Sequence, residues 1–286
     1  MKLEIKGHSG CQIDVVREED VLYIYKTTHD AGYLDRLEQQ GRKQQNAANV
    51  NMQHIRVPRV LDIRRDVDSV TLKMEYVYSK NFVGYFEYAG FEQISYFIRA
   101  LCLYLDYEIK HSTLQTIDSK VLKDKYEDVQ QKILQNALLC KDAEIIDLLQ
   151  FAANRFNNVK EMALPIGVCH GDLTFSNILF NGNNYYLIDF LDSFVESPLL
   201  DIVKIRQDSA FLWSQLMYSG QYDEIRLKIV ASKIDDEIVR YANQFEWYQH
   251  YQIFQLMNFL RVLQYAHEEN VINYLKQIIR QLLYEF

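Results

Sequence analysis

The stretch HGDLTFSN at residues 170–177 decides the fold of this 286-residue chain. Twelve positions after Asn177, Asp189 follows within LIDF at residues 187–190. The sequence between them, NGNN at 181–184, is typical of a turn joining two apolar runs. The pattern predicts a loop, a strand, a hairpin turn and a second strand. Such a hairpin would bring Asp172, Asn177 and Asp189 into one small region.

These three residues suit the chemistry of a hard divalent cation. Two carboxylates and an amide oxygen match Mg²⁺, which takes oxygen ligands and keeps several waters. Phosphoryl transfer uses such ions, together with a carboxylate that orients the acceptor hydroxyl and accepts its proton. The protein-kinase pattern H-R-D-x-x-x-x-N followed by D-F-G supplies this set, and here H-G-D-x-x-x-x-N is followed by I-D-F. We expect Asp172 to be the base and Asn177 and Asp189 to hold Mg²⁺.

The two motifs resemble those of the aminoglycoside phosphotransferase and choline kinase family, which has a protein-kinase-like fold. The resemblance implies an α+β, bilobal chain. A small antiparallel-sheet lobe, residues 1–78, would bind the nucleotide, and a larger helical lobe, residues 79–286, would carry the catalytic and acceptor sites. The periodicity agrees, because apolar residues alternate before residue 80, apart from a polar helical segment at 30–50, and recur at helical spacing after it.

The resemblance also implies an ATP site in the first lobe. Lys26 ends the predicted strand 21–26 and is expected to contact the phosphates, held by Glu38 of the helical segment, for which Asp35 is a competing candidate. The turn GHSG at 7–10 offers backbone N–H groups to phosphate, and the sequence MEYV at 74–77 resembles a hinge that binds adenine. The further nucleotide-binding residues expected from these two segments are Gly7, Ser9, Gly10, Met74, Glu75 and Val77.

Four more residues are assigned to the catalytic loop, as we call residues 170–177, and to its surroundings. His170 is expected to bind backbone groups rather than act as a base, because Asp172 already fills that role. Asp201, within PLLD at 198–201, is expected to brace the loop. Arg206 and Asp208 follow on the same segment, and we expect them to bind charged or polar groups of the acceptor.

Departures from the protein-kinase pattern favour a small-molecule acceptor with a hydroxyl group. Leu191 replaces the glycine of D-F-G, no A-P-E motif follows, and Leu200 comes only eleven positions after Asp189, which is too close for a long activation segment. A sugar, an amino alcohol and an aminoglycoside-like molecule all remain candidates. Two alternatives stay open: a pseudokinase or regulatory module that binds nucleotide without transfer, and transfer to a protein hydroxyl.

Composition and charge restrict the classes of partner that the protein is expected to bind. Hydrophobic residues make up 49% and charged residues 24% of the chain, as in soluble globular proteins. The net charge of −8 argues against nucleic acid. The acidic excess lies beyond residue 80, where it suits either a cationic ligand or solubilising charge on helices. Four cysteines without metal or redox spacing, no signal-like N-terminus and no long apolar run predict reduced thiols, no membrane insertion and a cytoplasmic location.

Overall fold

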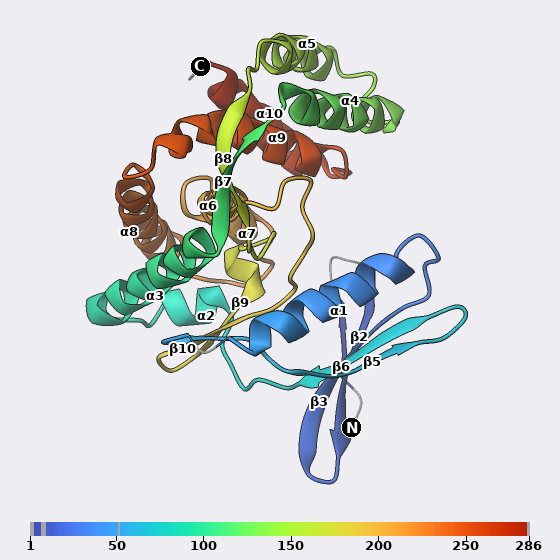
Figure 1. The fold of residues 1–286 in the computed structure, drawn as a ribbon, viewed down its shortest axis with the longest axis vertical. Coiled ribbons are helices and arrows are strands. Elements are labelled where there is room, and N and C mark those ends of the chain that lie inside the picture. Colours follow the sequence, from blue (N-terminus) through green and yellow to red (C-terminus); the bar gives the residue numbers. More distant parts are fainter. Residues whose placement is uncertain (1–2, 7–9, 51, 285–286) are drawn as a thin grey trace.

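The N-terminal part of the computed structural model, which describes residues 3–6, 10–50 and 52–284, is an antiparallel sheet. Its five strands run in the order β1-β2-β3-β6-β5 (Figure 1). The bounds are β1 Leu3–Lys6, β2 Gln12–Glu18, β3 Val21–Thr28, β5 Val60–Arg65 and β6 Val70–Glu75. Glu19 and Asp20 turn β2 into β3 with positive φ angles, which suits a tight hairpin.

One helix, α1 (Leu34–Ala48), lies against this sheet and buries a small apolar core with it. Its closest approach is at Gly41, where an added Cβ would stand 2.6 Å from a methyl of Leu72 on β6. Lys26 of β3 pairs in register with Leu72, and paired residues of neighbouring strands point to the same face of a sheet. Lys26 therefore projects from the face that α1 covers.

The larger C-terminal part is mainly helical (Figure 1). Its α-helices are α2 Phe82–Phe86, α3 Phe91–Lys110, α4 Ser119–Gln135, α5 Ala143–Asn157, α6 Pro198–Ser209, α7 Trp213–Leu216, α8 Glu224–Ala242, α9 Tyr251–Leu263 and α10 Glu269–Tyr284. Two short 3₁₀ helices are η1 Phe175–Asn177 and η2 Glu246–His250, and a strand pair is β7 Ser112–Ile117 with β8 Met162–Gly167. The predicted α+β class, with an N-terminal antiparallel sheet and a larger helical part, is confirmed.

A third, small sheet connects the two parts. The predicted hairpin after the catalytic loop is present as β9 (Ile178–Asn181) and β10 (Asn184–Leu187). A two-residue strand, β4 (Ile55–Arg56), pairs in parallel with β10, and Lys80 forms a backbone bridge to Phe180 of β9. β4 ends just before Pro58, which has no N–H to donate, and β5 begins only at Val60.

None of the helices in the described part of the chain is long and apolar enough to cross a membrane.

Candidate active site

The catalytic loop places Asp172 and Asn177 in direct contact. The amide nitrogen of Asn177 donates to Oδ2 and to the backbone carbonyl of Asp172, each at 2.8 Å. Both bonds use the nitrogen, so the amide oxygen of Asn177 stays available to a cation. The backbone carbonyl of Asn177 accepts from the N–H of Ile188 at 3.0 Å. Asn177 therefore lies beside the segment that carries Asp189.

Asp189 meets the lysine of the N-terminal sheet. Lys26, only 3% exposed, places its Nζ 2.9 Å from Oδ1 of Asp189, across 163 positions of sequence. Burial lowers the pKa of Lys26, but the nearby Asp189 carboxylate outweighs it and raises that pKa overall. Asp189 has φ +61°, a left-handed conformation that is uncommon outside glycine and concentrates at functional sites. The structure thus brings together Lys26, Asp172, Asn177 and Asp189.

A second lysine, which the sequence analysis did not identify, contacts Asp172. The Nζ of Lys204, on α6, lies 3.0 Å from Oδ1 of Asp172. Burial raises the pKa of Asp172, but the charge and hydrogen bond of Lys204 outweigh it and hold that pKa below its usual value. Asp172 is therefore ionised at neutral pH, as a base must be. Lys204 lies one helical turn after Asp201, a spacing that places both on the loop-facing side of α6.

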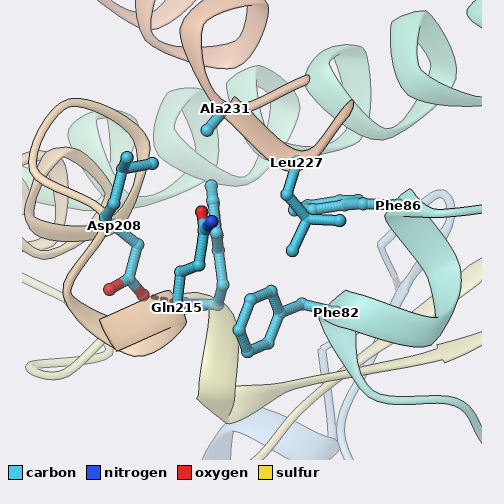
Figure 2. Close-up of a pocket in the computed structure, with 8 residues that line it drawn as sticks. Phe82, Phe86, Asp208, Gln215, Leu227 and Ala231 are labelled. Atoms are coloured by element: carbon cyan, nitrogen blue, oxygen red, sulfur yellow. Dashed lines mark hydrogen bonds between the residues drawn. The ribbon is translucent and has the colours of Figure 1, made fainter. Parts of the chain in front are cut away.

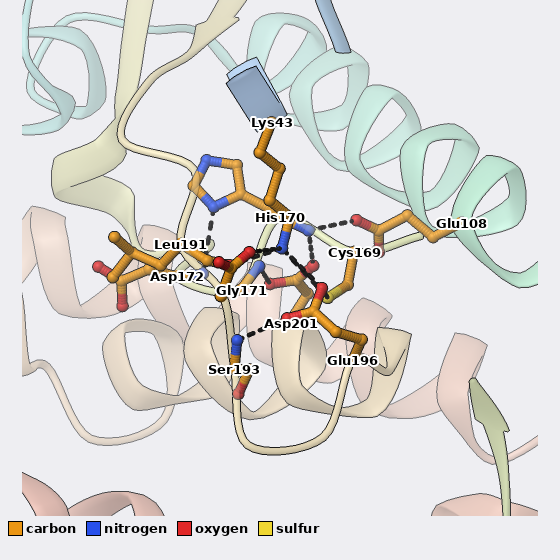
Figure 3. Close-up of polar contacts among 11 residues, drawn as sticks. Lys43, Glu108, Cys169, His170, Gly171, Asp172, Leu191, Ser193, Glu196 and Asp201 are labelled. Atoms are coloured by element: carbon orange, nitrogen blue, oxygen red, sulfur yellow. Dashed lines mark hydrogen bonds and ion pairs between the residues drawn. The ribbon is translucent and has the colours of Figure 1, made fainter. Parts of the chain in front are cut away.

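Two fully buried carboxyl groups hold the start of this loop (Figure 3). Asp201 accepts from the backbone N–H groups of His170 and Gly171, which agrees with its expected bracing role. Glu108 of α3 accepts from the same N–H of His170 at 3.0 Å. Burial, then the adjacent Asp201 carboxylate, raise the pKa of Glu108 well above its usual value, which favours its protonated form. The sequence held one signal for Glu108, which interrupts the apolar stripe of α3 three positions after Leu105.

His170 and Gly171 also serve the backbone of the loop. The His170 ring donates from Nε2 to the carbonyl of Ile188 at 2.9 Å and accepts from the N–H of Asp172 at Nδ1. Burial lowers the pKa of His170, so its ring stays neutral in this role. Gly171 has φ +87°, and a Cβ there would stand 2.0 Å from the carbonyl oxygen of Leu191. Only glycine fits this position, where many protein kinases have arginine.

Lys43 of α1 holds the segment after Asp189 (Figure 3). Its Nζ donates to the carbonyl of Leu191 at 2.6 Å and to Glu196 at 2.7 Å. Glu196 in turn accepts from the N–H of Ser193. Burial lowers the pKa of Lys43, but nearby acidic groups, Glu196 among them, outweigh it and raise that pKa. The helix of the N-terminal part is thereby attached to the segment that follows Asp189.

The expectation that Glu38 holds Lys26 is not met. Glu38 accepts instead from Arg42 and Arg65, on the side of α1 toward β5. The positions of α1 that are buried against the sheet include the neutral residues Gln40 and Gln44. Lys26 therefore has Asp189, rather than a carboxylate of α1, as its partner among the described residues.

The glycine turn and the hinge are described in part. Gly7 and Ser9 lie outside the described residues, and Gly10 is exposed with φ +70°. In the hinge segment Met74 is buried, while the N–H of Glu75 donates to the carbonyl of Arg59 at 3.0 Å. The N–H of Glu75 is therefore committed within the sheet. The N–H of Val77 has no hydrogen-bond partner in the described part of the chain, which leaves it available to the adenine of a nucleotide.

The two residues expected at the acceptor site face elsewhere, which corrects both assignments. Arg206 donates from Nε and Nη2 to both oxygens of Asp235, at 2.9 and 3.0 Å, and stacks on Tyr251. It lines a cavity of about 830 Å³ among α6, α8, η2, α9 and α10, to which no residue of the catalytic loop contributes. Residues two apart on a helix point in opposite directions, so Arg206 faces away from the side that carries Lys204.

Asp208 is 2% exposed and already saturated with hydrogen bonds. Its oxygens accept from the N–H of Phe175 at 2.6 Å and from the N–H and hydroxyl of Ser214, each at 2.9 Å. The cavity beside it, shown in Figure 2, measures only about 10 Å³, which is room for one water at most. Burial raises the pKa of Asp208 to about 6. Asp208 therefore braces the catalytic loop from behind.

Comparisons with known proteins agree with this fold. The chain is similar in structure to a GDP and kanamycin complex of APH(2")-IIia, with 12% identity, a TM-score of 0.60, and coverage of 100% of this chain and 93% of that one. It is similar to the spectinomycin phosphotransferase APH(9)-Ia in complex with ADP and spectinomycin, with 12% identity, a TM-score of 0.51, and coverage of 99% and 92%. At these identities the likeness shows the fold. No curated protein matches the sequence significantly.

A family model described as the phosphotransferase enzyme family (APH) matches residues 15–225, which include Lys26, the catalytic loop and Asp189. That is most of the chain, and it contains every residue that the structure brings together around Asp172. The chain belongs to the phosphotransferase enzyme family.

Proposed function

We propose that this protein is a Mg²⁺-dependent kinase that transfers the γ-phosphate of ATP to a hydroxyl group of a small molecule. A sugar, an amino alcohol and an aminoglycoside-like molecule are the classes of acceptor considered. The observation that supports it most is the convergence of Lys26, Asp172, Asn177 and Asp189 from the sheet, the loop and the hairpin. The family and the fold support phosphoryl transfer as the reaction class.

Each residue has a separate task in the proposal. Asp172, held ionised by Lys204, orients the acceptor hydroxyl and accepts its proton. Asn177 and Asp189 offer oxygens to Mg²⁺, which when bound would neutralise charge on the phosphates. Lys26 contacts the phosphates from the N-terminal lobe, residues 1–78, whose hinge binds adenine through Val77. The C-terminal lobe, residues 79–286, supplies the base and the acceptor site.

The short segment after Asp189 supports a small acceptor rather than a protein. Residues 190–197 run directly from the hairpin to α6, and Lys43 and Glu196 hold them in place. Long activation segments, which dock protein substrates in protein kinases, need a mobile stretch that this chain lacks between Asp189 and Pro198. Binding of nucleotide without transfer remains the alternative, and the partnering of Lys26 with Asp189 instead of a helix carboxylate is the observation that favours it.

The deciding experiment measures ADP release with Mg²⁺ and ATP over a panel of sugars, amino alcohols and aminoglycosides. We expect turnover with a subset of acceptors, and its loss by at least about a thousandfold in Asp172→Asn, because the base is removed while the shape is kept. ATP affinity, measured by calorimetry, should stay within about threefold. Asp236→Asn, an exposed aspartate on α8, is the matched control. ATP binding without turnover of any acceptor would support the alternative instead.

A further inference from the structure

The carboxylate of Asp172, the proposed base, contacts a positively charged side chain. Oδ2 of Asp172 is bonded to Asn177, and Oδ1 lies 3.0 Å from Nζ of Lys204. Lys204 is itself largely buried and also reaches Gln207 at 3.3 Å. An acceptor hydroxyl that approaches Asp172 therefore arrives beside a positive charge. That environment favours an acceptor with negative charge near its reacting hydroxyl.

A second cation of this region, Arg261, has no hydrogen-bond or ion-pair partner among the described residues. Arg261, in the last turn of α9, places its guanidinium 5.4 Å from the ring centroid of Phe194, in the segment that follows Asp189. The side chain is half-buried, yet the guanidinium forms no hydrogen bond or ion pair with any residue that the structure describes. A guanidinium carries five N–H donors in a planar fork. Partial burial of such a group is unfavourable without hydrogen-bond partners, and a ligand with an anionic group would supply them.

The packing of Arg261 on Phe194 places it at the side of the molecule that carries Asp172, because the same segment joins the loop where the N–H of Leu191 donates to the carbonyl of His170 at 2.9 Å. Burial lowers the pKa of Arg261, Asp172 and Asp128 raise it, and Arg36 of α1 lowers it again. Asp128 is already bonded to Lys125 and Lys132. Arg261 thus lies within electrostatic reach of the base and of a third cation, Arg36.

We propose that the acceptor carries an anionic group, a carboxylate or a phosphate, which the Arg261 guanidinium binds while the acceptor hydroxyl lies at Asp172 beside Lys204. The proposal rests on the proposed function and names the substrate class of the same site. A planar fork binds carboxylate or phosphate through two parallel hydrogen bonds, which also fixes the orientation of the bound molecule.

Two acidic residues near α6, which could have bound a cationic acceptor, are already occupied. Asp208 is buried and bonded to Phe175 and Ser214, and Asp235 is paired with Arg206. The net charge of −8 therefore says little about the acceptor, because Lys204 lies 3.0 Å from Asp172 and Arg261 is within electrostatic reach of it. Local charge rather than net charge decides the preference of a site.

The test compares acceptors that share hydroxyl groups and differ in charge. The two sets are glycerol, glycerate and glycerol 3-phosphate, and glucose, glucuronate and glucose 6-phosphate. We expect at least one anionic member to exceed its neutral partner about tenfold or more in kcat/KM, and the better of the two anions identifies the group. Arg261→Gln should raise the KM of that anion about tenfold or more, with kcat and the KM for ATP nearly unchanged. Arg261→Lys should recover part of the affinity, and Arg240→Gln, an exposed arginine of α8, is the control.

A binding measurement keeps the outcome independent of turnover. Glycerol 3-phosphate and glycerate are titrated by calorimetry into the protein loaded with Mg²⁺ and ADP, and into its Arg261→Gln variant after thermal melting confirms that the variant is folded. Saturable binding that weakens about tenfold in the variant supports the site, even if no acceptor is phosphorylated, in which case only the proposed function fails. Absence of binding, equal binding by both proteins, or weaker binding of ATP alone in the variant would overturn the proposal.

Discussion

Replacement of Gly171 by alanine tests how the catalytic loop is held against the segment after Asp189. Gly171 has φ +87°, where a residue with a Cβ is strained by about 1–2 kcal/mol. The new Cβ would also stand 2.0 Å from the carbonyl oxygen of Leu191, which is backbone and cannot rotate away. Overpacking of this kind costs about 1–3 kcal/mol. We therefore expect Gly171→Ala to lower the free energy of unfolding by about 2–5 kcal/mol.

Gly182 provides a matched control for this substitution. It has a similar positive φ of +58°, but nothing lies within 4 Å of the Cβ position. Gly182→Ala should therefore cost only the backbone strain of about 1–2 kcal/mol. Urea denaturation followed by the fluorescence of Trp213 and Trp247 measures both, because both tryptophans belong to the helical part. Equal losses in the two variants would refute the argument that the contact with Leu191 requires glycine.

Three further predictions concern the residues around the loop. Lys43→Met should lower the free energy of unfolding by about 1–3 kcal/mol and also reduce kcat, whereas Lys43→Arg should keep most of the stability and of kcat. Unchanged stability and kcat in the methionine variant would contradict the attachment of α1 to the segment after Asp189 through Lys43. Glu108→Gln should lower the free energy of unfolding by less than about 1 kcal/mol, because burial favours the protonated carboxyl. Asp201→Asn removes a carboxylate that accepts from two N–H groups and should lower it by about 1–3 kcal/mol. Equal losses in the two variants would show that Glu108 is ionised. Lys204→Met should move the acidic limb of the kcat/KM profile to higher pH, because burial then raises the pKa of Asp172 without the opposing lysine, and an unmoved limb would exclude Lys204 as the cause.

The part of the site that could be predicted from sequence is the part that is local in the chain. Asp172, Asn177 and Asp189 fall within eighteen positions, and a loop followed by a hairpin brings them together whatever the rest does. Lys43 and Lys204 depend on how α1 and α6 are rotated about their axes, and their spacing alone does not reveal that. Glu38 shows the same limit, since it lies two positions from the buried Gln40, and two positions turn a helix by about 200°.

The burial of Arg206 and Asp208, the residues expected at the acceptor site, could not be predicted from the sequence either. Arg206 and Asp208 share one helix with Lys204, at alternate positions of a polar segment that follows Asp201. The structure divides them among three surroundings, because α6 is packed on every side by other helices and the catalytic loop. The surroundings of a charged residue on such a helix depend on its neighbours in space, and these come from α7, α8 and α9.

The small sheet of β4, β10 and β9 limits how the hairpin β5–β6 can move against the helical part. The hairpin β5–β6 departs from this sheet at β4 and returns to it at Lys80, so it is attached at two separate points. Two fixed points leave one easy motion, a rotation about the line that joins them. Sliding or twisting would break backbone hydrogen bonds at Tyr185 or Phe180. Displacement then grows with distance from that line, so closure over a nucleotide would move the far turn at 66–69 most and the residues beside β4 least.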